Sequence, residues 1–324
     1  MINAIKTGHR TRKIGSFISG TWLKFMGVVD LYARLSDKRK QTLSAISYAL
    51  GAGRIRSNWI YLKSLYSFII FSKNYADRAF NSTNEIIEQA EKIYIEGEHH
   101  AAEALSSGRP LLITTIHMGD FQLGFLRLMT RFKPKRKTFL FKLNPGDQKE
   151  VALMKAFDQV KAEPTVLRVD ESGGKAAYLA LRQSHIVVLT IDLEVNVKSR
   201  SVIDFFGKPC HMQNGPATIA VLTKALVVPV VAFTNSKGQK IVRIEPMIDS
   251  DAKVHGATVE QRINQVTQQL ANQMQQWLTD SPSQAHLWTY IADTMLCPLP
   301  CPMQCRSLEP VDARKAKYAS TELN

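Results

Sequence analysis

Hydrophobic residues are spaced differently in the first hundred residues and in the rest of the chain. In the first part apolar positions recur every three or four residues, which predicts helices. One such run, Asn84 to Ser106, predicts a helix that stops at Gly108. From Leu111 onward, short β-branched apolar runs of the kind found in buried strands take over. The pattern therefore predicts a helical N-terminal region followed by an α/β region.

Strand and helix signals alternate in this second part. Expected strands are Leu111–Ile116, Thr138–Lys142, a segment beginning at Thr165, Ile186–Ile191, Val202–Phe206, Val227–Phe233 and, at a sheet edge, Lys240–Ile244. Expected helices are Phe121–Phe132, Asp147–Lys161, Gly174–Ser184 and Pro216–Ala225. Such alternation favours right-handed βαβ units. We expect an α/β fold with a mixed, mostly parallel central sheet flanked by helices.

A long amphipathic helix closes the α/β region. Its apolar stripe consists of Val259, Ile263, Val266, Leu270, Met274 and Trp277. The helix is expected to end before Pro282. Periodicity is lost after about residue 297, which predicts a loose tail. We therefore expect three regions: 1–83 helical and basic, 84–296 α/β, and 297–324 a C-terminal tail.

The composition is that of a globular protein with a strong positive charge. Hydrophobic residues make up 45% and charged residues 22%, which excludes a disordered or collagen-like chain. Lys and Arg number 42 against 28 Asp and Glu, a net charge of +14. Such an excess predicts an acidic partner: nucleic acid, anionic lipid or an acidic carrier protein. The usual nucleic-acid motifs are absent from the sequence, so we expect no nucleic-acid partner.

The N-terminal region has aromatic, apolar segments that are too short to span a bilayer. Residues 16–30 are interrupted by Lys24, and residues 59–71 contain Lys63. Nor does the N-terminus resemble a secretory signal. Basic residues surround both segments, which leaves two interpretations open. The segments form helices attached to an anionic membrane surface, or they form a packed helical cap with a solvated basic face.

The cysteines and histidines predict neither a disulfide framework nor a metal site. Cys210 is isolated, and Cys297, Cys301 and Cys305 lie in a Pro-rich segment without zinc-type spacing. Reduced thiols are expected, and therefore a cytosolic compartment.

One histidine occupies a position suited to chemistry. His117 follows the predicted strand at Leu111 and precedes a predicted helix, which is where open α/β sheets bind ligands. Gly119 lets the backbone approach a ligand, and the helix N-terminus offers N–H groups and a positive dipole end. His117 can act as a general base. The alternative is a hydrogen-bonded structural histidine at a strand end.

The stretch GEHHAAEALSSGRPLLITTIHMGDFQ resembles the entry to the active site of the bacterial lipid A biosynthesis acyltransferases. These are lauroyl and myristoyl acyltransferases, with phosphatidylinositol mannoside acyltransferases as relatives. Further segments resemble the family in the same order: Ile186–Asp192, Ser201–Pro209, Gly215–Pro229, and Pro282 with Gln284 and Trp288. The resemblance covers about Glu85 to Trp288.

The resemblance implies a glycerolipid acyltransferase-like fold and a transfer reaction. A fatty acyl chain would move from a thioester, on acyl carrier protein or CoA, to a hydroxyl or amine of a lipid or glycolipid. No cofactor beyond the thioester donor is implied. An acidic carrier and an anionic membrane both suit the positive charge. We expect a peripheral protein at the cytoplasmic face of the bacterial inner membrane.

The family signature, His-x4-Asp/Glu, makes His117 the base but places Gln122 where the acid belongs. A glutamine can orient an imidazole but cannot stabilise its charged form. Three interpretations follow. Asp120 replaces the acid; or Asp192 or Glu194, near the end of a neighbouring strand, reaches the ring. Otherwise the protein is a silent relative that serves as a membrane-surface or acyl-carrier-binding module.

Two other segments are candidates for substrate binding besides Gly119. The first is the basic run containing Lys133, Lys135 and Arg136, which could meet phosphates, an acidic carrier or the reaction's oxyanion. Its alternative is an ordinary solvated loop. The second is Phe205, Phe206 and Gly207, which resemble a family segment. Two aromatic residues before a glycine are also typical of a core and a turn.

Overall fold

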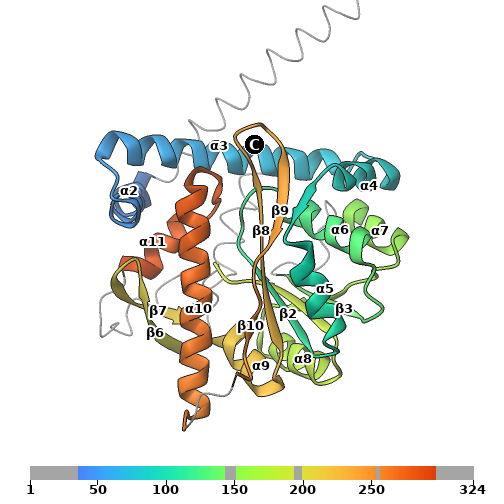
Figure 1. The fold of residues 1–324 in the computed structure, drawn as a ribbon. Helices are drawn as coiled ribbons and strands as arrows, with labels where there is room; N and C mark the ends of the chain where they lie inside the picture. Colours follow the sequence, from blue (N-terminus) through green and yellow to red (C-terminus); the bar gives the residue numbers. More distant parts are fainter. Residues whose placement is uncertain (1–35, 143–150, 193–198, 253–255, 297–324) are drawn as a thin grey trace, which may run out of the picture.

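A computed structural model describes residues 36–142, 151–192, 199–252 and 256–296 (Figure 1). Its centre is an eight-stranded sheet in the order β1-β9-β8-β2-β5-β3-β4, with β10 paired to β8. The strands are β1 (Tyr94–Glu96), β2 (Leu111–Thr115), β3 (Thr138–Lys142), β4 (Thr165–Arg168), β5 (Ile186–Thr190), β8 (Leu226–Thr234), β9 (Lys240–Ile244) and β10 (Ile248–Asp249). Strands β2, β3, β4, β5 and β8 run parallel, whereas β9 and β10 are antiparallel to β8. The predicted fold class is confirmed.

Helices cover both faces of this sheet. One face carries α4 (Thr83–Glu91), α5 (Glu98–Ser106), α6 (Phe121–Phe132) and α7 (Val151–Gln159); the other carries α8 (Glu171–Arg182), α9 (Gly215–Thr223) and α10 (Val259–Asp280). Alternate strand residues point to opposite faces, so Leu111 and Ile113 join the first core and Leu112 joins the second. β2 is buried along its whole length, and burial on both faces explains why it contains no charged residue.

A third core lies beside the sheet. It contains the hairpin β6 (Arg200–Phe205) and β7 (Lys208–Gln213), and the helices α2 (Ser36–Leu50), α3 (Arg54–Arg78) and α11 (Trp288–Leu296). A short 3-10 turn, η2 (Pro282–Gln284), joins α10 to α11. Helices α2 and α3 confirm the predicted helical N-terminal region over residues 36–78. Helix α3 extends across the top of the molecule in the view of Figure 1, at the level where the β8–β9 hairpin ends.

The prediction of one helix from Asn84 to Ser106 was wrong. The segment forms α4, the strand β1 and α5. Gly97 separates the last two elements with a φ of 74°, and a Cβ there would come within 2.1 Å of the Ile244 carbonyl oxygen. The same close approach allows β1 to pair with β9, so that β1, not β9, is the edge strand. The sequence pattern also did not reveal β7 or α11. The predicted C-terminal tail lies outside the described residues.

Candidate active site

Strand register places His117 beside Asp192. β2 and β5 are parallel neighbours in which Thr115 pairs with Thr190, so the residues two steps further along also meet. His117 Nδ1 lies 2.8 Å from Asp192 Oδ1, and the His117 backbone N–H donates to Oδ2 at 2.7 Å. The Asp192 side chain is 1% exposed and that of His117 22%. A buried carboxylate on Nδ1 fixes the proton there and leaves Nε2 as the basic atom.

The loop that carries His117 is fixed by a second segment of chain. The backbone N–H of His286 donates to the His117 carbonyl at 2.9 Å, and that of Gly119 donates to the Gln284 carbonyl at 3.3 Å. The Gln284 side-chain amide in turn makes two 2.7 Å hydrogen bonds with the backbone of Thr234, at the end of β8. The strand ends and the loop therefore form one hydrogen-bonded unit.

Gly119 is the position in this loop that requires a glycine. Its φ is 53°, in the left-handed region. A Cβ there would lie 2.5 Å from the Ala232 carbonyl oxygen. The glycine lets the loop cross β8 closely enough to hold the backbone next to His117. Gly119 thus has a structural role in positioning this loop.

Asp120 points to two cations. Its carboxylate pairs with Arg78, the last residue of α3, and with Lys240 at 3.1 Å. Arg78 is buried, with a 2% exposed side chain. The Asp120 pair therefore connects the end of α3 to the loop after His117, and the carboxylate on the imidazole is that of Asp192.

Aromatic rings line the site on the side of α3. Phe121 meets the His117 ring edge-on at 4.9 Å between centroids, and Phe71 stacks on Phe121 at 5.4 Å. Phe71 also meets the His286 ring at 4.9 Å, and Phe68 meets it at 5.8 Å. An apolar wall of this kind lowers the local polarity around a reacting base.

The family model described as bacterial lipid A biosynthesis acyltransferase matches residues 21–291. The chain belongs to the bacterial lipid A biosynthesis acyltransferase family. It is therefore an acyltransferase family member, and a lipid acceptor is implied. The comparison with curated proteins gives no match.

A solved structure is also similar, though distantly. It is the 1-acyl-sn-glycerophosphate (LPA) acyltransferase PlsC from Thermotoga maritima, at 12% identity and a TM-score of 0.34. The alignment covers 73% of this chain and 97% of that one. A TM-score this low supports no further inference.

In this lipid A acyltransferase family member, some of the site residues expected from the sequence come together around His117. His117 and Asp192 are in direct contact, and Gly119 and Asp120 lie in the same loop. Gln122, at the position of the family acid, lies in the first turn of α6 and is partly exposed. Glu194 lies outside the described residues. The His117 ring thus has a carboxylate partner that comes from the next strand.

The basic run lies at the opposite end of the strands from His117. Lys133 ends α6, and Arg136 donates to the carbonyls of Arg109 at 2.5 Å and Ser184 at 3.2 Å, just before β2 and β5 begin. About six strand residues at roughly 3.3 Å each, some 20 Å in all, separate the start of β2 from His117. This run, Lys135 included, therefore does not reach the His117 ring. Arg136 closes the start of two strands.

The aromatic segment lies in the third core. Phe205 is fully buried there together with Ile116 and Met118, which flank His117. Phe206 and Gly207 form the turn between β6 and β7, with φ values of 54° and 73°. Phe205 therefore packs beneath the loop that carries His117, and Phe206 and Gly207 form a turn.

Sequence reasoning missed three residues near His117 and Asp192: Phe71, Arg78 and His286. Phe71 and Arg78 belong to no local motif. His286 lies between Gln284 and Trp288, in a segment that resembles the family, but that resemblance did not single it out. Within the described ranges, no three or more His, Cys, Asp or Glu side chains are grouped to hold a metal. None of the helices described in the structure is long and apolar enough to cross a bilayer.

Proposed function

We propose that the protein transfers a fatty acyl chain from acyl carrier protein or acyl-CoA to a hydroxyl or amine of a lipid or glycolipid. His117 is the general base, and Asp192 is its carboxylate partner. The observation that carries this proposal is the 2.8 Å contact between His117 Nδ1 and Asp192 Oδ1. A buried carboxylate in this position stabilises the imidazolium, which a glutamine cannot do.

The reaction follows from this arrangement. His117 Nε2 accepts the proton of the acceptor hydroxyl or amine while its oxygen or nitrogen bonds to the thioester carbon. The carbonyl oxygen becomes an oxyanion in the tetrahedral intermediate. The C–S bond then breaks, and the departing thiolate takes the proton from His117. Throughout, Asp192 keeps the Nδ1 proton in place and offsets the charge on the ring.

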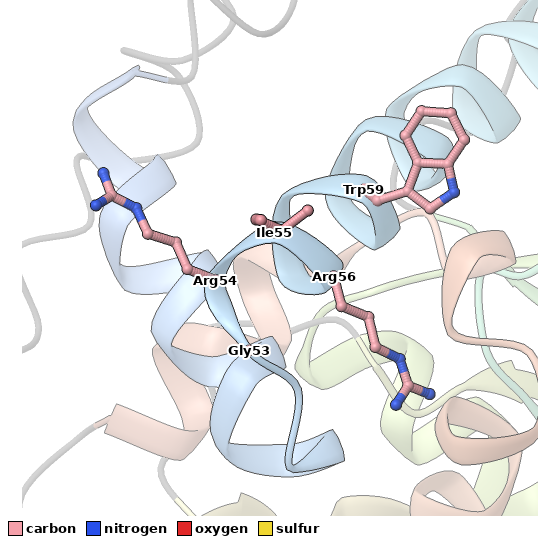
Figure 2. Close-up of a pocket in the computed structure, with 5 residues that line it drawn as sticks. All are labelled: Gly53, Arg54, Ile55, Arg56 and Trp59. Atoms are coloured by element: carbon pink, nitrogen blue, oxygen red, sulfur yellow. The ribbon is translucent and has the colours of Figure 1, made fainter.

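The outer side of α3 supports attachment to an anionic membrane surface. Ile55 is 88% exposed and Trp59 58%, far more than large apolar side chains usually are. Figure 2 shows them with Arg54 and Arg56 around a shallow depression at the start of α3. Apolar residues flanked by cations are typical of helices that lie in a membrane interface.

The same helix connects this surface to the reaction site. Its outer side carries Ile55 and Trp59, and its other residues Phe71 and Arg78 contact Phe121 and Asp120 beside His117. Attachment through α3 would place His117 close to lipid headgroups, at the cytoplasmic face of the inner membrane. The net charge of +14 also suits an acidic carrier as donor.

The test is acyl transfer by His117→Ala. Purified variants are incubated with a lipid A precursor and a donor, acyl carrier protein or CoA, that carries a radiolabelled acyl chain. The labelled lipid is then counted. We expect a 10²- to 10⁴-fold lower rate, which is the usual contribution of a general base. His99→Ala, at an exposed position on α5, is the matched control and should keep the wild-type rate.

Two outcomes contradict the proposal. Wild-type transfer by a well-folded His117→Ala protein removes His117 from the chemistry. Absence of transfer by the wild-type protein with both donors, together with retained binding to the carrier or to vesicles, favours the silent binding module.

A further inference from the structure

His286 is a buried histidine whose ring has no hydrogen-bond partner among the described residues. The residue is 9% exposed, and both Nδ1 and Nε2 are buried without a donor or acceptor. More than nine in ten buried polar groups are paired in native proteins, and an unpaired one costs about 1–3 kcal/mol. A residue kept at such a cost is a candidate for function.

This ring lies at the proposed reaction site. The His286 backbone N–H donates to the carbonyl of His117, so the two residues lie side by side. The His286 ring contacts Phe71, which stacks on Phe121, which in turn contacts the His117 ring. The His286 ring therefore belongs to the same cluster of aromatic rings that contacts the His117 ring.

The ring stays neutral at physiological pH. Burial, followed by the nearby charge of His117, lowers the pKa of His286 to about 4. A neutral imidazole carries one N–H donor and one acceptor nitrogen. It can donate a hydrogen bond without adding a positive charge that would oppose protonation of His117.

Acyl transfer needs a hydrogen-bond donor for the oxyanion. The basic run lies about 20 Å away, at the end of the sheet where β2 and β5 begin. We infer that His286 supplies this donor, with its imidazole N–H binding the thioester carbonyl oxygen of the acyl substrate. The inference rests on the proposed function. As the acceptor oxygen or nitrogen bonds to the carbonyl carbon, the C=O electron pair moves onto oxygen and is held by this N–H. When the C–S bond breaks, the carbonyl re-forms and releases it.

The rings of Phe68 and Phe71 lie against His286. Both are only partly buried and both belong to α3. The acyl thioester reaches the imidazole by displacing these two side chains. The imidazole N–H therefore leaves its apolar surroundings only when substrate is bound.

The test compares His286→Phe with His286→Gln. Phe keeps a ring of similar size in an aromatic wall but has no N–H donor, whereas Gln keeps a donor. We expect His286→Phe to lower kcat 10²- to 10³-fold with little change in KM, as for loss of an oxyanion donor. Its Tm should equal or exceed that of the wild type. His286→Gln should stay within about tenfold of the wild-type kcat, by the same reasoning.

His185→Phe is the matched control. His185 also has a buried Nδ1 that lacks a partner among the described residues, and its ring lies against Phe139. It immediately precedes β5, at the opposite end of that strand from Asp192. Its replacement should leave kcat unchanged. If His286→Phe folds poorly, His286→Met and His286→Gln are compared per folded molecule. Equal rates then overturn the inference, and a rate retained only by Gln supports it.

The outcomes separate the inference from the proposed function. Wild-type kcat in folded His286→Phe, with transfer still lost in His117→Ala, overturns only the role of His286. Absence of His117-dependent transfer overturns the proposed function itself.

Discussion

His117 and Asp192 occupy equivalent positions in two adjacent parallel strands: each lies six residues after one member of the facing pair Leu111 and Ile186. Leu111 pairs with Ile186, and 117 − 111 and 192 − 186 are both six. Equal offsets in parallel strands bring two side chains together at the carboxyl end of the sheet, and here Asp192 accepts from both the ring and the backbone of His117. The charge that the family signature places five residues after the histidine is supplied by the neighbouring strand.

This contact predicts different effects for two carboxylates. Asp192→Asn should lower kcat/KM by about 10²–10⁴-fold, because the amide favours the wrong imidazole tautomer and cannot stabilise the imidazolium. Asp120→Asn should lower it less than about tenfold per folded molecule, because Asp120 binds Arg78 and Lys240. Steady-state kinetics, corrected for the folded fraction by circular dichroism, compare the two. A larger loss in Asp120→Asn would identify Asp120 as the acid.

The fold class and the position of His117 could be predicted from local sequence, whereas the partner of the histidine could not be chosen. Continuous apolar runs identify β2 and β5 because these strands are buried on both faces. The choice between Asp120 and Asp192 depended on which strands are neighbours, and periodicity carries no information on strand order. Arg78 and His286 reach the site through tertiary contacts alone.

The misread segment around β1 has a similar cause. Tyr94–Glu96 is too short to interrupt a helical pattern on its own, and its strand conformation depends on pairing with β9. Gly97 was the local signal for the break. Its need for a positive φ is visible only once the Ile244 carbonyl is known to lie against it.

The buried pair of Arg78 and Asp120 predicts an asymmetric loss of stability. Asp120→Asn leaves the buried Arg78 guanidinium without its carboxylate and should cost about 3–5 kcal/mol of unfolding free energy. Arg78→Met should cost less, because Lys240 still neutralises Asp120 at 3.1 Å. Urea denaturation of both single variants and the double variant gives the coupling energy. Equal costs and no coupling would show that the pair does not hold α3 to the loop.

The exposed residues of α3 predict lipid binding that depends on salt and on Trp59. Trp59 is 58% exposed in the protein and would be buried in the membrane interface on binding. Trp59→Ser should therefore weaken binding to vesicles containing anionic lipid about 10- to 100-fold, the usual effect of removing a large apolar side chain from an apolar environment. Raising the salt concentration should independently weaken binding by the wild-type protein, because salt screens the charges of Arg54 and Arg56. Vesicle flotation measures both effects.

Leu222→Ser is the control for that experiment. Leu222 is 49% exposed on α9, at the other end of the molecule from α3 (Figure 1). Its replacement should leave vesicle binding unchanged. Equal binding of the wild-type protein to neutral and anionic vesicles at both salt concentrations would contradict the electrostatic contribution, and full binding by Trp59→Ser would contradict the role of α3.

The depressed pKa of His286 predicts that the protein loses stability as the pH falls from about 6.5 to about 4. Burial holds the folded-state pKa near 4, against an ordinary value of 6.5. Between these values the unfolded chain binds a proton that the folded protein does not, so lowering the pH favours unfolding. The contribution is fully present above pH 6.5, and the total loss by pH 4 is on the order of 3 kcal/mol. His286→Phe has no such proton to bind. Urea denaturation at pH 7.5 and pH 4 should therefore show the variant gaining stability relative to wild type, by that amount, at the lower pH. A stability difference between the two proteins that stays constant with pH would mean that the His286 ring is protonated in the folded state as readily as in the unfolded chain.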